Sequence, residues 1–293
     1  MLEIEITKND ADQRLDKFLM KTFPELTKSM MYKAIRNKKI KVNRKRCEFN
    51  QPLVTGDHIL LFLPPDVLVQ KQRVVEKSLP LDILYEDENI IVIHKPVGLL
   101  SQSDQKEGQD CLVSRVQSYL YEKKEWDPNG EHAFAPTICH RLDRNTEGLV
   151  VAAKNAMALR VMNEAIKEHK LHKFYVAWVD GVLDQSFYKM RYFLKKDGTK
   201  AIVSARKREG FVSANMNVKV LKREANRSLI EVELLTGRFH QIRALMGFVH
   251  HPLCHDRKYG SLGRGQYFLR AYRLDLSEVD LPLQKTIFEI QSK

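Results

Sequence analysis

The sequence predicts an α+β fold, with a large domain on a mainly antiparallel mixed sheet and a small N-terminal module of helices and hairpin-like strands. Two observations carry this prediction. From residue 81 onward, strand patterns outnumber helix patterns, and few of them alternate in β-α-β order. Before residue 64, two short helix patterns precede short strands, and a stretch bounded by prolines follows. A chain of 293 residues is long enough to bury a core in each part.

The N-terminal module, residues 1–63, is defined by its apolar spacing. Apolar residues three and four positions apart mark the first helix: Leu15, Phe18 and Leu19. Thr27 is the expected N-cap of a second helix. The expected buried face of that helix consists of Met31, Ala34 and Ile35. The stretch KIKVN then alternates basic and apolar residues, as a half-buried strand does, and VTGDHILLF completes a small sheet.

Two stretches are predicted to lack regular structure. Residues 64–80, PPDVLVQKQRVVEKSLP, begin and end with proline and show no clear amphipathic period, so we interpret them as a linker. The large domain then covers residues 81–293. Within it, residues 122–135, EKKEWDPNGEHAFA, are expected to form an exposed loop.

The elements of the large domain follow from local patterns. ILYEDENIIVIHKP predicts two strands around an Asp-Glu-Asn turn, and residues 110–121 and 155–169 have helical apolar spacing. FYVAWVDG, AIVSAR, NVKVL and SLIEVELL predict further strands. The segment LLTGRFHQIRALMGFVHHPLCHDRKYG predicts strand, turn, helix and loop. Thr236 is the expected cap of that helix, and Gly237 allows a tight entry into it.

Composition argues against several classes of protein. No apolar run approaches the ~18 residues of a membrane span, and the polar N-terminus does not resemble a signal or transit peptide. Four cysteines without CxxC spacing fit reduced thiols, so a cytoplasmic protein is expected. The segment HHPLCH gathers three histidines and Cys254, but it has no second ligand pair at zinc spacing, so no metal is expected.

Basic charge is clustered along the chain. The formal net charge of +12 favours a polyanionic partner. Nine basic residues and no acid lie between residues 28 and 46: Lys28, Lys33, Arg36, Lys38, Lys39, Lys41, Arg44, Lys45 and Arg46. A second basic patch spans residues 189–208. Such blocks can be merely solvated, but blocks this free of acids more often bind nucleic-acid phosphates.

One carboxylate stands out as a candidate for chemistry. The segment ICHRLDRNTEGLVVAAKN places Asp143 between Arg141 and Arg144, on a turn at the mouth of a buried strand. Two close guanidinium groups should favour the ionised carboxylate and lower the pKa of Asp143. An ionised carboxylate in a cleft acts as a nucleophile or as an electrostatic stabiliser. The alternative is a surface Asp–Arg pair without chemistry. On the predicted helix of the HQIR segment, Arg243 could project toward such a carboxylate.

Four segments, in order, resemble the RluA-type pseudouridine synthases. They are ILYEDENIIVIHKPVGL, HRLDRNTEGLVVAAKN, KFYVAWVDG and TGRFHQIRALMGFVHHPL with HDRKYG. The N-terminal module resembles the small αL RNA-binding module of a small-subunit ribosomal protein, so that the likeness covers nearly the whole chain. The resemblance implies isomerisation of uridine to pseudouridine in structured RNA, ribosomal or transfer RNA, without metal or organic cofactor. We also expect a monomer.

The resemblance further implies roles for individual residues. Asp143 is the essential nucleophile or base, Tyr175 packs against the target base and assists proton removal, and Arg243 pairs with Asp143. Arg141 would occupy the space that the flipped uridine vacates. Further contacts to the substrate are expected from Arg144, His140, Arg238 and His240.

The chain also departs from the family pattern. Glu147 stands where the family often has serine, and Leu245 where it usually has histidine. His250 and His255 occupy two common glycine positions, and LSQS replaces the usual His-Pro after KPVGL. These changes bear on the RNA target and the groove wall. The alternative function is a catalytically silent RNA-binding or ribosome-assembly protein, against which the intact Asp–Tyr–Arg set argues.

Overall fold

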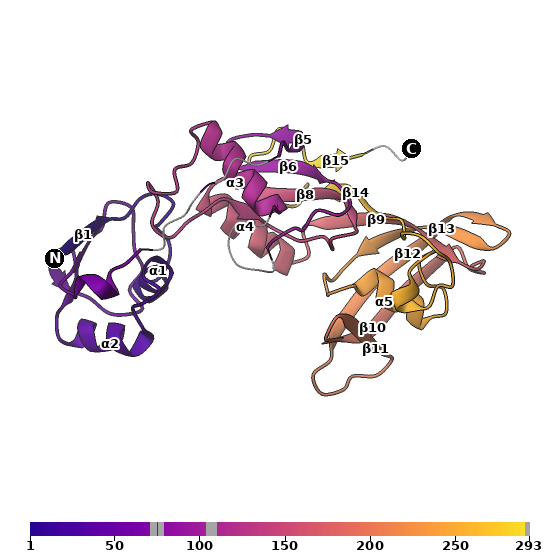
Figure 1. Ribbon diagram of the computed structural model, residues 1–293, viewed down its shortest axis with the longest axis horizontal. Coiled ribbons are helices and arrows are strands. Elements are labelled where there is room, and N and C mark those ends of the chain that lie inside the picture. Colours follow the sequence, from indigo (N-terminus) through magenta and orange to yellow (C-terminus); the bar gives the residue numbers. More distant parts are fainter. Residues whose placement is uncertain (71–74, 76–78, 104–109, 291–293) are drawn as a thin grey trace. The chain divides into compact units, whose positions relative to one another are not determined.

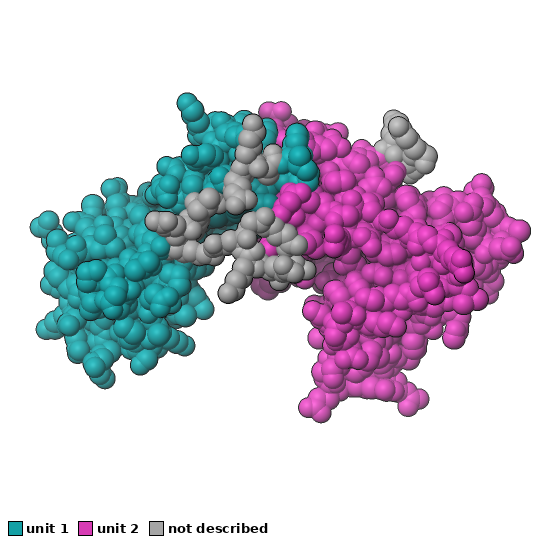
Figure 2. Space-filling view, in the orientation of Figure 1, with its two compact units in different colours: residues 1–80, 113–137, 153–160 teal, residues 81–112, 138–152, 161–293 magenta. Residues whose placement is uncertain are grey.

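The chain divides into two compact units in a computed structural model that describes residues 1–70, 75, 79–103 and 110–290 (Figure 2). Unit 1 comprises Met1–Pro80, Val113–Thr137 and Ala153–Arg160. Unit 2 comprises Leu81–Leu112, Ile138–Ala152 and Val161–Lys293. In the part of the chain that the structure describes, no helix has both the length and the apolar character needed to cross a bilayer.

Unit 1 holds a four-stranded antiparallel sheet of order β1-β4-β2-β3. Its strands and first two helices are β1 (Leu2–Glu5), α1 (Leu15–Thr22), α2 (Lys28–Arg36), β2 (Ile40–Val42), β3 (Lys45–Arg46) and β4 (His58–Leu61). The predicted cap is confirmed, because the hydroxyl of Thr27 accepts a hydrogen bond from the backbone N–H of Met30. The predicted apolar faces of both helices are buried in one core. The N-terminal module therefore folds as its periodicity predicted.

The two predicted irregular stretches differ from expectation in part. The linker begins with a short 3-10 helix, η1 (Pro65–Val67), whose Val67 is buried in the core of unit 1. Residues 71–74 and 76–78 of the linker lie outside the described residues. Residues 123–136 contain no helix or strand, but Trp126 and Phe134 are buried. The prediction of an exposed loop was therefore wrong for these two side chains. Burial of a large aromatic side chain removes much apolar surface from water, even within a polar stretch.

Unit 2 is built on an eleven-stranded sheet of order β11-β10-β12-β13-β9-β14-β8-β6-β5, with β15 on β14 and β7 on β8 (Figure 1). The strands are β5 (Asp82–Glu86), β6 (Ile90–Lys95), β7 (Thr137–Ile138), β8 (Glu147–Ala153), β9 (His172–Asp180), β10 (Phe187–Asp197), β11 (Lys200–Ser204), β12 (Val212–Glu224), β13 (Arg227–Leu234), β14 (Leu269–Asp275) and β15 (Ile287–Glu289). Among the described residues, seven strand pairings of this sheet have an antiparallel register, and β8 pairs with β14 in parallel. The predicted α+β class with a mainly antiparallel mixed sheet is confirmed.

The remaining helices are α3 (Leu112–Glu122), α4 (Ala156–Lys167), α5 (Gln241–Phe248) and the short η2 (Arg257–Tyr259). The helices α3 and α4 lie where apolar spacing predicted them. The expected cap of α5 was wrong, because its N-cap is His240, with φ 53°, and the hydroxyl of Thr236 donates instead to Oε1 of Gln241 at 2.8 Å. Helix α5 packs against β10, β11 and η2.

Gly148 fixes the start of β8 beside β14. Its φ is +134°, a region that L-residues rarely adopt. A Cβ at this position would lie 2.3 Å from the backbone oxygen of Ala271, its partner in the parallel pairing. Only glycine fits here, so the turn that precedes β8 and carries Asp143 is held at a fixed place in the sheet.

Candidate active site

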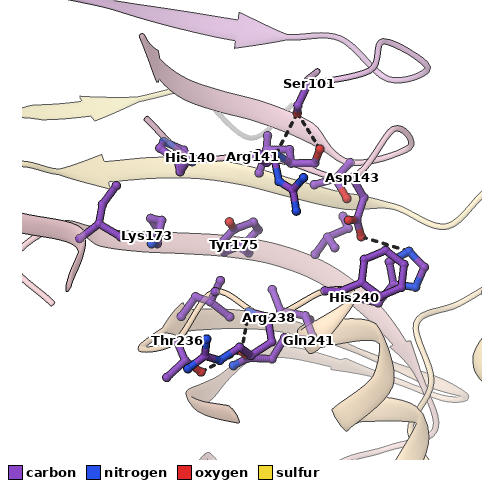
Figure 3. A pocket seen from close by; sticks show the side chains of 18 of the residues that line it. Ser101, His140, Arg141, Asp143, Lys173, Tyr175, Thr236, Arg238, His240 and Gln241 are labelled. Atoms are coloured by element: carbon purple, nitrogen blue, oxygen red, sulfur yellow. Dashed lines mark hydrogen bonds and ion pairs between the residues drawn. The ribbon is translucent and has the colours of Figure 1, made fainter. Parts of the chain in front are cut away.

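Unit 2 contains a pocket of about 1030 Å³, and three of the segments that line it carry the predicted site residues (Figure 3). One wall is the turn Cys139–Arg144, and a second is β9 with Lys173 and Tyr175. The third is the connection from β13 into α5, residues 234–243. Segments that are distant in the sequence thus meet around one cavity, which brings together the motifs that contain Asp143, Tyr175 and Arg243.

Asp143 lies in the wall of this pocket with 28% of its side chain exposed. Its Oδ2 is 3.7 Å from Nε2 of His240 and 3.9 Å from Nη1 of Arg243. Burial raises the pKa of Asp143, and the charges of Arg243, Arg141 and Lys95 oppose this only in part. The predicted lowering of this pKa was therefore wrong, because desolvation in the pocket outweighs the surrounding cations.

The two arginines that flank Asp143 in the sequence have different contacts and different roles. Arg141 is exposed, lines the pocket, and its charge favours the ionised form of Asp143. Arg144 donates from Nε to the backbone oxygen of Gly98 at 3.0 Å, so it ties the Asp143 turn to the loop after β6. The sequence predicted that both arginines would favour the ionised form of Asp143. This prediction holds for Arg141 and is wrong for Arg144.

Lys95 supplies a third cation that the sequence reasoning missed. It is fully buried, and its Nζ donates to the backbone oxygens of Pro96 and Leu99 at 2.9 Å and of Arg144 at 3.3 Å. Burial lowers the pKa of Lys95 to about 8 even though Asp143 and Glu147 favour the charged form. A lysine at the end of the apolar strand IIVIHK was the available signal, because a charged residue there must find partners inside the protein.

Arg243 has a stronger partner than the one inferred from the family. Its Nε and Nη2 donate to Asp256 at 2.6 and 3.0 Å, and Asp256 is 2% exposed. Its guanidinium also lies over the rings of Tyr267 and Tyr259, at 4.4 and 5.2 Å from their centroids. The contact with Asp143, at 3.9 Å, is therefore the second contact of a guanidinium already fixed by a bidentate pair.

Tyr175 and Lys173 present side chains from the same face of β9, since residues two apart on a strand share a face. Tyr175 is 5% exposed, and burial together with the charge of Asp143 raises the pKa of its phenol. The hydroxyl of Tyr175 is therefore protonated at neutral pH, and its ring lines the pocket. Lys173 is 8% exposed, and burial lowers its pKa to about 8.

His140, another expected substrate contact, forms a hydrogen bond to strand β8 of the sheet. Its Nε2 accepts a hydrogen bond from the backbone N–H of Val151 at 3.3 Å. Burial lowers the pKa of His140 to about 3, and the charge of Lys173 adds to this effect. His140 is therefore a neutral ring at the Lys173 end of the pocket, away from Asp143 (Figure 3).

A small polar network shapes the wall before α5. The side chain of Gln241 donates to the backbone oxygen of Asn215 at 2.9 Å and accepts from the backbone N–H of Arg238 at 3.1 Å. Arg238 donates from its Nε to the backbone oxygen of Ser213. The exposed Arg238 and the ring of His240 thus face the pocket from a rigid turn, and Gln241 is a supporting residue that the motif alone did not reveal.

The departures from the family pattern have clear places in the structure. Glu147 accepts from Nε2 of His94 at 2.9 Å and lies 3.1 Å from Nη2 of Arg270, so it belongs to an ion-pair group inside the sheet. Leu245 is fully buried in α5. His250 and His255 have φ of 64° and 71°, which is the conformation that favours glycine. The two histidines therefore occupy strained backbone positions.

The HHPLCH segment does not gather metal ligands. His251 contacts the backbone oxygen of Asp180, and Cys254 is buried. Across the described residues, no cluster of three or more His, Cys, Asp or Glu side chains could hold a metal ion.

The basic residues predicted to bind RNA lie in unit 1, on and around α2, β2 and β3. All nine are exposed except Lys41, which is half-buried. Lys28 lies over the ring of Tyr32, and Lys41 over the ring of Phe62. Their side chains are thus available to a polyanion.

Two family models match the chain. Residues 89–247 match RNA pseudouridylate synthase, and residues 13–59 match the S4 domain. The first match covers more than half of the chain and contains Asp143, Tyr175 and Arg243.

Full-length relatives agree with these matches. An uncharacterised RNA pseudouridine synthase of Mycoplasma capricolum is 33% identical over 97% of this chain and 94% of its own length. The ribosomal large subunit pseudouridine synthase C of Vibrio parahaemolyticus is 27% identical over 98% of this chain and 94% of its own. The corresponding synthase D of Borreliella burgdorferi is 28% identical over 99% and 90%. Among solved structures, the human RNA pseudouridylate synthase domain containing 4 has a similar fold, with a TM-score of 0.57 at 22% identity over 71% of this chain and 87% of its own.

Proposed function

Because this chain belongs to the RNA pseudouridylate synthase family and isomerises uridine to pseudouridine in RNA, we propose that Asp143 is its reacting group and ribosomal RNA its substrate. The observation that carries the first part is the partly exposed carboxylate of Asp143 in the pocket wall, with Arg141, Arg243 and Lys95 near it. The second part is supported by the relatives named as large-subunit synthases.

The reaction is an internal rearrangement and needs no other reactant. The bond from N1 of uracil to C1′ of ribose breaks, the detached base turns, and a bond from C5 to C1′ forms. C5 then loses a proton and N1 gains one, so the atoms of substrate and product balance. A carboxylate beside the sugar can form a transient bond to the sugar or base, or can remove a proton. The pocket must also hold the free base, which requires a flipped nucleotide.

The residues around Asp143 fit separate parts of this task. The ring of Tyr175 provides a flat surface for the base, and its protonated hydroxyl can donate a hydrogen bond. We assign proton removal to Asp143 rather than to Tyr175, because a phenol with a raised pKa is a poor base at neutral pH. Arg141 is exposed, so its side chain can enter the space left in the RNA.

The two units suggest a division of labour between binding and chemistry. The S4 domain match and the exposed basic residues of unit 1 support contacts with phosphates. All residues proposed for chemistry belong to unit 2. Monomeric state, cytoplasmic location and independence of metal stay predictions, which sedimentation, cell fractionation and metal analysis test directly.

The variant Asp143→Asn tests the reacting group, and Asp280→Asn, an exposed aspartate of unit 2, serves as the matched control. Pseudouridine formation is measured on unmodified ribosomal RNA and on transfer RNA, with RNA binding measured in parallel. We expect Asp143→Asn to bind RNA and form no pseudouridine, and the control to match the wild type. Turnover by Asp143→Asn would refute the assignment. If the wild type formed pseudouridine only in transfer RNA, the proposal of ribosomal RNA as the substrate would be refuted.

A further inference from the structure

The hydroxyl of Tyr259 joins two parts of the active-site wall. Tyr259 ends the short helix η2, and its Oη accepts a hydrogen bond from the backbone N–H of Ala201 on β11 at 2.9 Å. The same Oη lies 2.8 Å from Nδ1 of His240. The neighbouring Lys258 donates to the backbone oxygen of Thr199 at 2.7 Å, so η2 is tied to the β10–β11 turn at two points.

These contacts favour one of the two nitrogens of His240 as the site of the proton. A backbone N–H can only donate, so the hydroxyl of Tyr259 is the acceptor toward Ala201. Its own hydrogen is then free to point at Nδ1 of His240, which can accept it when Nδ1 carries no hydrogen. A neutral imidazole with a bare Nδ1 carries its hydrogen on Nε2. Every hydrogen in the chain of contacts then has an acceptor.

The opposite side of the ring supports the same assignment. Nε2 of His240 faces Oδ2 of Asp143 at 3.7 Å. An N–H there attracts the carboxylate, whereas a bare nitrogen would turn its lone pair toward a negative oxygen. The distance exceeds that of a hydrogen bond, and a movement of under ~1 Å would close it. Arg243 approaches the same Oδ2, so both contacts leave Oδ1 as the oxygen to face the substrate.

The ring of His240 has little freedom to change this arrangement. Its side chain is 10% exposed and stacks on Phe239, with centroids 3.8 Å apart and planes at 19°. Its backbone is held in a left-handed conformation at the start of α5. Burial and the charges of Arg243, Lys258 and Lys196 lower the pKa of His240 to about 3, so the imidazole is neutral.

We propose that Tyr259 and His240 are positioning residues for the isomerisation: the Tyr259 hydroxyl holds His240 as the Nε2–H tautomer, and that N–H orients Oδ2 of Asp143. The contribution of His240 is a neutral dipole rather than a full charge, so it steers the carboxylate without pairing it. This inference rests on the proposed role of Asp143, whereas the tautomer itself does not depend on that role.

Nitrogen-15 correlation spectra of the histidine rings in the full chain test the tautomer directly. The signals of His240 are identified by their loss in His240→Gln. We expect a protonated Nε2 and a bare Nδ1 in the wild type, and a mixture of both tautomers in Tyr259→Phe. A protonated Nδ1 in the wild type would overturn the inference, whatever the activity of Asp143→Asn.

Kinetics on RNA test the consequence for turnover. His240→Gln keeps an N–H near the position of Nε2, and His240→Asn keeps one only near Nδ1, so Gln should retain more activity than Asn. Tyr259→Phe should lower kcat about tenfold, the factor for one neutral hydrogen bond, with KM for RNA unchanged. In the His240→Gln background the same change should have little effect, because an amide N–H has no tautomer to fix.

Several outcomes would contradict the proposal. Equal losses from Tyr259→Phe in both backgrounds would mean a structural role through Ala201 alone. Equal activity of His240→Gln and His240→Asn would mean that the N–H at the Nε2 position does not contribute to the reaction. Thermal unfolding checks that each variant folds, and if Tyr259→Phe does not fold, the wild-type spectrum and the Gln–Asn comparison still decide. Loss of all turnover in Asp143→Asn is the separate test of the proposed function.

Discussion

Replacing Lys173 by methionine should make the protein more stable at neutral pH. Lys173 is 8% exposed, and within the described chain it forms no hydrogen bond or ion pair that would offset burial of its charge. Burial lowers its pKa from 10.5 to about 8. Since one pKa unit corresponds to about 1.4 kcal/mol, the ionised lysine costs the folded state about 3 kcal/mol. Methionine has a similar length and no charge, so Lys173→Met should recover up to about this amount.

The pH dependence of this gain follows from the two pKa values. Below pH 8 the lysine is protonated in both the folded and the unfolded protein, so the full cost is present. As the pH rises from about 8 toward 10.5, the folded lysine loses its proton first and the cost disappears. The gain in Lys173→Met should therefore be largest at pH 7 and small at pH 10.5.

Denaturant unfolding of both proteins at pH 7 and pH 10.5 measures the effect. Lys95→Met is the matched control, because Lys95 is also buried and its pKa is also lowered to about 8, yet its Nζ donates to three backbone oxygens. That variant should lose stability, since each unsatisfied buried carbonyl costs roughly 1–3 kcal/mol. An equal gain for Lys173→Met at both pH values would refute the charge argument. A loss at pH 7 would mean that Lys173 has a partner in the folded protein.

Further predictions concern the site and the RNA surface. Arg243→Met should destabilise the protein by about 3–5 kcal/mol, because it leaves Asp256 buried and unpaired; adding Asp256→Leu should restore stability in thermal unfolding but not turnover. Turnover should require ionised Asp143, so kcat/KM should fall with decreasing pH at a higher pH than for an ordinary aspartate, given the raised pKa; an acid limb at or below the ordinary position would contradict this. His250→Gly should raise the free energy of unfolding by up to ~1 kcal/mol, since the left-handed backbone there favours glycine. Glutamine at the three exposed residues 44–46 should flatten the slope of log affinity against log salt by about 2–3; an unchanged slope would show that this surface does not bind the RNA.

Local pattern was sufficient for most of the fold. The first two helices of unit 1, the Thr27 cap and several strands of the large sheet follow from spacing over a few residues, whereas β10, β14 and β15 were not predicted. The cap of α5 did not, because His240 takes a left-handed conformation that no local pattern announces, and Thr236 is drawn into a contact with Gln241. Local reasoning fails where a tertiary contact competes for the same side chain.

The candidate site was predictable in its motifs and not in its pairings. Asp143, Tyr175 and Arg243 do line or border one pocket. The partner of Arg243 is Asp256, 13 residues away on a loop whose path the sequence does not define. The pKa of Asp143 was mispredicted for a related reason. Neighbouring charges are visible in a sequence, but the degree of burial depends on walls contributed by distant segments.

The pairing of Arg243 explains how a carboxylate among cations can stay reactive. If the guanidinium gave both its short contacts to Asp143, the carboxylate would be fully paired and a weak nucleophile or base. Asp256 takes those contacts instead, at 2.6 and 3.0 Å, and leaves Asp143 at 3.9 Å. Asp143 is thereby partly desolvated and only partly compensated, which is why its pKa is raised. Asp256 thus holds Arg243 in place and also prevents Arg243 from forming a full ion pair with Asp143, the proposed reacting group.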